Sequence, residues 1–144
     1  MRRFLTALAL TSALLAGGYA QQPARGALSN PKKSQAYEML SARKAEAEAE
    51  LRGLRGRYHG KYEGVVRKTF ELSALEREMD GMAAVEPSRA QALTADYAYL
   101  VLRKVALEVE LRDLRSRNSL RHPYTAKVKA ELDALGREIE RRLW

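Results

Sequence analysis

Residues 97–117 read YAYLVLRKVALEVELRDLRSR, and sixty positions earlier residues 37–57 read YEMLSARKAEAEAELRGLRGR. The match continues from ELSALERE at 71–78 to ELDALGRE at 131–138. Without a gap, 17 of the 42 positions in 37–78 are identical to their counterparts in 97–138. Identity over this length indicates a duplicated structural unit of 60 residues.

Apolar or long side chains recur every three or four residues within each copy, which is the spacing of helices that pack along a seam. In the first copy they are Tyr37, Leu40, Lys44, Ala47, Leu51, Leu54 and Tyr58. The stretches YHGKYEG at 58–64 and NSLRHPY at 118–124 interrupt this spacing. The sequence therefore predicts an all-α fold of tandem antiparallel helical hairpins, forming an up-down four-helix bundle or an elongated coiled coil.

The predicted hairpins span residues 30–84 and 85–144. Asn30 followed by Pro31 is a typical helix start, because Asn caps free N–H groups and Pro lacks one. The second hairpin is expected to restart at Ser88, with Gln91 completing a capping box. Its first helix has a wider apolar face than the others, which predicts the most buried helix, in contact with two neighbours.

The N-terminus, MRRFLTALALTSALLAGGYAQQ, has the three parts of a secretory signal peptide. Arg2 and Arg3 precede an apolar stretch. Gly18 and Ala20 then supply the small residues that signal peptidase requires, so cleavage is expected before Gln21. The apolar stretch is short for a membrane span, although an uncleaved N-terminal anchor remains an alternative. We therefore expect a signal peptide at 1–20, a flexible segment at 21–29, and a protein exported to the periplasm, the cell envelope or the extracellular space.

The chain has no cysteine, which excludes disulfides and thiolate metal sites. Its formal net charge is +8, of which the two arginines of the leader contribute two charges. A positive balance favours anionic partners such as acidic envelope polymers or lipid headgroups. Basic and acidic residues are interspersed along the chain. The sequence has no basic stripe free of acids, so nucleic acid is not an expected partner.

Both histidines fall in the predicted helix breaks, and the two breaks of an up-down bundle lie at the same end. This end is a candidate binding tip composed of Tyr58, His59, Lys61, Tyr62, Arg121, His122 and Tyr124. Aromatic and cationic groups are enriched at protein interfaces and suit anionic ligands. A purely structural role stays open, in which the rings cap the bundle and the cations keep it hydrated. No metal site is expected, because Glu63 is the only nearby acid.

Lys44 and Lys104 occupy equivalent seam positions in the two copies. Their stems are expected to pack while their charges reach solvent, or the lysines fix the register as polar seam residues do. On either interpretation, replacing both with Leu should raise thermal stability.

No pattern of a nucleophile, a general base or a phosphate-binding loop is present in the sequence, so we expect no enzyme and no cofactor. The expected function is that of an exported helical interaction or scaffold protein of the cell envelope, with a protein partner, a second copy of itself as a homodimer, or an anionic polymer. The chain is also similar to small periplasmic stress chaperones in being exported, basic, helical and free of cysteine. The alternative is therefore a chaperone-like binder of unfolded or anionic clients.

Overall fold

The computed structural model describes residues 30–117 and 123–143. These residues form four long helices, α1 (Gln35–Arg55), α2 (Glu63–Ala83), α3 (Ala95–Ser116) and α4 (Pro123–Leu143), and two short 3-10 helices, η1 (Pro31–Lys33) and η2 (Pro87–Ala92). All regular elements in these ranges are helical, so the all-α prediction is confirmed. The predicted signal peptide at 1–20 and the segment at 21–29 lie outside the described residues.

Two successive caps start the first half of the fold. The side chain of Asn30 accepts a hydrogen bond from the Lys32 backbone N–H at 3.0 Å and starts η1. The hydroxyl of Ser34 accepts one from the Tyr37 backbone N–H at 3.2 Å and starts α1. The helix predicted to start after Asn30 is therefore only a single 3-10 turn, and the long helix begins after the next cap, Ser34.

The predicted start of the second half at Ser88, with a capping box to Gln91, is wrong. These residues lie in η2, and α3 begins after Thr94, whose hydroxyl caps the Tyr97 N–H at 3.4 Å. The reason is tertiary: Leu93 is buried in a non-helical conformation. Its carbonyl also accepts a hydrogen bond from the Ala36 N–H at 3.2 Å, which ties the connection to the start of α1.

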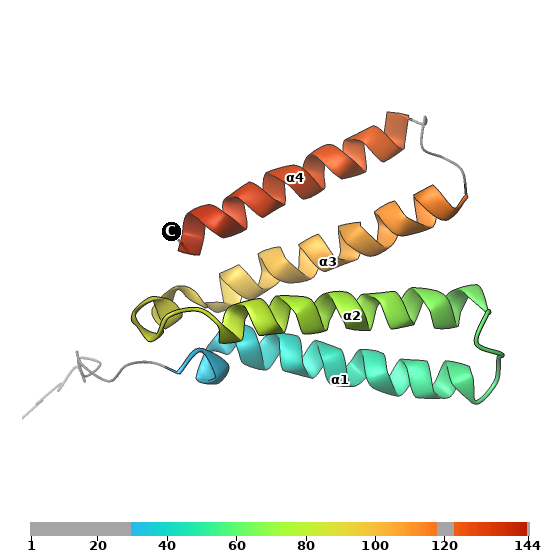
Figure 1. The fold of residues 1–144 in the computed structure, drawn as a ribbon, viewed down its shortest axis with the longest axis horizontal. Coiled ribbons are helices and arrows are strands. Elements are labelled where there is room, and N and C mark those ends of the chain that lie inside the picture. Colours follow the sequence, from blue (N-terminus) through green and yellow to red (C-terminus); the bar gives the residue numbers. More distant parts are fainter. Residues whose placement is uncertain (1–29, 118–122, 144) are drawn as a thin grey trace, which may run out of the picture.

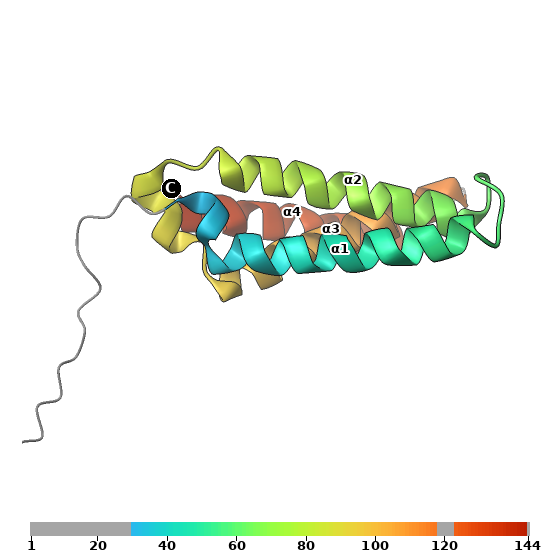
Figure 2. The same cartoon turned by 90° about the horizontal axis from the view of Figure 1, so that it is seen from below.

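The third helix lies at the centre of the fold, because α3 packs against α1, α2 and α4. Successive helices lead the chain from one end of the molecule to the other (Figure 1). Viewed from below, α1 and α2 lie in front, with α3 and α4 behind them (Figure 2). Seven residues of α3 are buried, more than in any other described helix. The prediction that this helix is the most buried is confirmed, but it contacts three helices rather than two.

Two apolar clusters form the core. The larger one joins α1, α2 and α3 near η1 and η2, includes the fully buried Leu40, Leu75 and Val101, and also takes in Ile139 of α4. The smaller one lies between α3 and α4, where Leu107, Leu111 and Val128 are buried. Burying each such side chain stabilises the fold by about 1.5–3 kcal/mol. α4 is thus held by the smaller cluster along α3 and by Ile139 in the larger cluster.

Candidate functional site

The loop between α1 and α2, residues 56–62, displays a stacked pair of tyrosines at one end of the molecule (Figure 1). The rings of Tyr58 and Tyr62 lie 4.1 Å apart between centroids, at an interplanar angle of 16°. Their exposed fractions are 43% and 40%, so a partner can reach both rings. The Arg57 guanidinium lies 5.9 Å from the Tyr58 ring centroid, which places a cation beside this aromatic surface.

Local hydrogen bonds and one glycine shape this loop. The Tyr62 N–H donates to the His59 carbonyl at 3.0 Å, and the His59 Nδ1 accepts a hydrogen bond from the Lys61 N–H at 3.2 Å. A Cβ at Gly64 would lie 2.7 Å from the Tyr62 ring. The absence of a side chain at Gly64 thus allows this ring to lie against the first turn of α2.

The structure gathers four of the seven predicted tip residues in this loop: Tyr58, His59, Lys61 and Tyr62. Tyr124 lies at the same end of the molecule but at the start of α4, which Figure 1 shows apart from the loop. Its hydroxyl donates to the Glu110 carboxylate of α3, and this hydrogen bond raises the pKa of Tyr124. Arg121 and His122 lie outside the described residues.

Next to the loop at residues 56–62, ion pairs join the end of α3 to the start of α2. Arg117 pairs with Glu63 at 2.7 Å, and this contact lowers the pKa of the Glu63 carboxyl. Asp113 lies 3.3 Å from the guanidinium of Arg67. These ion pairs support the tip from a helix distant in sequence, and the helical spacing alone did not predict them.

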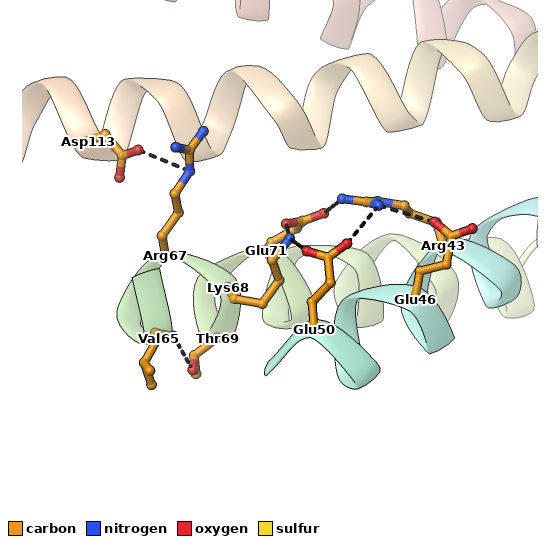
Figure 3. Close-up of polar contacts among 9 residues, drawn as sticks. All are labelled: Arg43, Glu46, Glu50, Val65, Arg67, Lys68, Thr69, Glu71 and Asp113. Atoms are coloured by element: carbon orange, nitrogen blue, oxygen red, sulfur yellow. Dashed lines mark hydrogen bonds and ion pairs between the residues drawn. The ribbon is translucent and has the colours of Figure 1, made fainter. Parts of the chain in front are cut away.

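A partly buried charge network joins α1 and α2 (Figure 3). Glu71 accepts hydrogen bonds from Arg43 at 2.5 Å and from Lys68 at 2.6 Å. Lys68 also lies 2.6 Å from Glu50, and Arg43 lies 3.2 Å from Glu46. Burial alone would raise the pKa of Glu71, but the hydrogen bonds from the two cations hold it below its ordinary value. The charges of this network satisfy one another, which indicates a structural role.

Both seam lysines reach acids of α2. The Lys44 ammonium lies 3.2 Å from Glu76 and 3.1 Å from Glu48. The Lys104 ammonium donates to Glu78 at 2.7 Å. The charged ends thus meet carboxylates of a neighbouring helix, and the proposed role in register stays a prediction.

A groove bounded by α2 and α4 lies over α3 and was not predicted from the sequence. Its volume is about 540 Å³, and its lining combines apolar and charged side chains: Phe70, Arg77, Glu108, Leu111, Arg112, Arg115, Lys129, Leu132 and Asp133. A second hollow of about 440 Å³ shares Phe70 and Arg112 with it. Phe70 could have been noticed in the sequence, because it lies outside the helical stripe formed by Val65, Leu72, Leu75, Met79 and Met82.

The Arg112 side chain joins the two hollows. Its guanidinium lies 4.7 Å from the Phe70 ring centroid and donates to the Val66 carbonyl at 3.1 Å. A cation held on an aromatic face in this way remains available to an anionic group on its open side.

No protein-family model, curated protein or solved structure matches this chain. In residues 30–117 and 123–143, no three acidic or histidine side chains cluster in a way that could hold a metal ion. No helix in these two ranges is both long enough and apolar enough to span a membrane.

Proposed function

We propose that this chain is an exported, non-enzymatic interaction protein of the cell envelope that acts by contact with a protein or an anionic polymer. The supporting observation is the exposed Tyr58–Tyr62 stack, which shares one short loop with His59 and Lys61. Tyrosine and cationic side chains provide much of the binding energy at interfaces. The proposal of export rests on the leader sequence at 1–20.

We also propose that the fold consists of one antiparallel helical hairpin used twice. The ion pair between Arg43 and Glu71 has a counterpart sixty residues later between Arg103 and Glu131, at 2.5 Å and 2.7 Å. Both pairs join the first helix of a proposed unit to its second helix. This equivalence adds a contact in space to the sequence identity and supports a duplication.

Site-specific photo-crosslinking tests the role of the tip. A photoreactive residue in place of Lys61 should crosslink an envelope component in cells. The same residue in place of Tyr99 should not, although Tyr99 is 62% exposed, because it lies near the start of α3 at the other end of the molecule. The crosslink at position 61 should disappear when Tyr58 and Tyr62 are both replaced by Ser. Equal labelling from positions 61 and 99 would contradict the proposal, as would no labelling.

The α2–α4 groove favours the second candidate function, a chaperone-like binder of unfolded or anionic clients. Its apolar floor and cationic rim suit client segments that carry both apolar and acidic residues. This candidate predicts that the protein suppresses aggregation of an unfolded client at up to an equal molar ratio. Aggregation at an unchanged rate would remove it.

A further inference from the structure

The fourth helix leaves part of its apolar stripe open. α4 packs against α3 and η2, and its Ile139 reaches the larger core cluster, while α1, α2 and α3 pack against one another. In the cluster between α3 and α4, Leu107 and Val128 are buried, whereas Leu132 and Leu135 are only partly buried. Leu132 and the partly buried Phe70 both line the α2–α4 groove, above the buried Leu111. The groove therefore has an apolar floor that a further side chain could cover.

The rim of this groove carries an excess of positive charge. Four cations line it, Arg77, Arg112, Arg115 and Lys129, against two acids, Glu108 and Asp133. Glu108 is already neutralised by Arg77 and lies 4.0 Å from Lys104. Within the described part of the chain, Arg115 and Lys129 form no ion pair.

The positive surface continues into the adjoining hollow, which Arg55 and Arg112 line without any acid. The hydroxyls of Thr69 and Ser73 in this hollow donate to carbonyls of their own helix, at 2.8 Å and 3.0 Å. The two hollows adjoin at Phe70 and Arg112, and each is lined by more cations than acids.

We infer that the α2–α4 groove binds an amphipathic helix of a partner protein, with acidic residues bordering the helix's apolar stripe. This inference rests on the proposed contact function and names the class of partner. A helix in a groove presents apolar anchors at i, i+3, i+4 and i+7, and its flanking acids would meet the rim cations. A purely anionic polymer would leave the partly buried side chains of Phe70 and Leu132 uncovered, and the same positive face of a second copy would repel this one.

The binding of a fluorescent peptide to residues 21–144, the chain without its proposed signal peptide, tests the inference. The probe is a helix-forming peptide of about 18 residues, or five turns, with Leu along one stripe and Glu on both flanks. A control peptide carries Lys in place of every Glu. Anisotropy should show binding of the acidic peptide alone, and binding should weaken as salt is raised.

Charge-reversal variants localise the site. Arg115→Glu combined with Lys129→Glu should weaken acidic-peptide binding at least tenfold, because both cations line the groove. The matched control combines Arg52→Glu and Lys127→Glu, which make the same charge change at exposed helix positions outside the groove lining. The control should bind within twofold of the unmodified protein, and circular dichroism should show equal helicity for both variants.

Two further probes decide on the occupant. Polyglutamate and phosphatidylglycerol vesicles present negative charge without an apolar helix face. If either probe binds the unmodified protein as tightly as the peptide does but fails to bind the variant with Arg115→Glu and Lys129→Glu, the helical partner is the wrong occupant. If the acidic peptide fails to bind, or binds equally to both variants, the inference is overturned. Crosslinking at position 61 would be unaffected, so failure of the groove and failure of the tip are distinguishable.

Discussion

Arg43 of α1 contacts Glu71 of α2 at 2.5 Å, and Arg103 of α3 contacts Glu131 of α4 at 2.7 Å in more exposed surroundings. The equivalent carboxylate, Glu131, is 41% exposed, whereas the Glu71 side chain is 13% exposed. The third partner also differs. Lys68 joins the network around Glu71, but the equivalent position holds the buried Val128. Position 68 thus holds a charged side chain that joins α1 and α2, whereas position 128 holds an apolar side chain that packs between α3 and α4.

Replacing Glu71 with Gln should therefore destabilise the protein by about 2 kcal/mol, because two partly buried cations lose their shared anion. The matched control is Glu131→Gln, in which a solvent-exposed ion pair is lost and little change is expected. Urea unfolding at pH 7, followed by circular dichroism, measures both variants. Equal losses at the two positions would show that the difference in burial has no energetic consequence.

The stabilising effect of Glu71 should also depend on pH. The pKa of Glu71 is lowered in the folded state from an ordinary value of 4.5, so its stabilising effect is present above that value. The effect is lost as the pH falls through the folded-state pKa. The stability gap between the unmodified protein and Glu71→Gln should be constant from about pH 7 to 5 and should narrow below pH 4.5. A gap that widened on acidification would contradict this assignment.

The seam lysines should respond unequally to substitution by Met. Glu78 is 12% exposed and lies 2.7 Å from Lys104, so Lys104→Met leaves a largely buried carboxylate poorly compensated. The expected loss is about 1–2 kcal/mol. Lys44→Met should leave the urea midpoint nearly unchanged, since its partner Glu76 is 57% exposed. A gain in stability from both substitutions would instead support the expectation that apolar seam residues are better at these positions.

The tyrosine stack can be perturbed without replacing either tyrosine. Gly64→Ala places a Cβ 2.7 Å from the Tyr62 ring, so this ring must shift, and we expect the shift to disturb its stacking on Tyr58. Gly60→Ala is the control in the same end of the molecule, because a Cβ there meets nothing within 4 Å. Near-ultraviolet circular dichroism should lose tyrosine signal in the first variant and keep it in the second. The crosslink from position 61 should weaken in parallel, and full crosslinking with a disrupted stack would separate the rings from binding.

The helical fold could be predicted from the sequence because the apolar spacing is local and repeated. The wide apolar face with Val101, Val105 and Val109 also indicated the most buried helix, and all three valines are buried. The start of α3 could not be predicted from capping residues alone. Its position depends on Leu93, whose burial and hydrogen bond to the start of α1 are tertiary contacts.

The candidate surfaces were predictable only in part, for a similar reason. Tyr58 and Tyr62 lie four residues apart in one break, so their proximity follows from a short loop. The α2–α4 groove instead combines Phe70, Arg112 and Lys129 from three helices. Which helices enclose a groove depends on the packing of α4 on α3, and helical periodicity determines only which face of each helix is apolar.

The proposed signal peptide at 1–20 predicts a defined mature N-terminus, and export decides whether the tip and the groove meet envelope partners at all. Signal peptidase requires small residues before the cleaved bond, and Gly18 and Ala20 meet this requirement. The exported protein should therefore begin at Gln21, as measured by intact mass and N-terminal sequencing. Ala20→Arg should leave the chain uncleaved and membrane-associated, whereas the control Gln22→Arg should still be processed. Protein that starts at Met1 and stays in the cytoplasm would remove the export proposal and leave the contact surfaces to be tested against cytoplasmic partners.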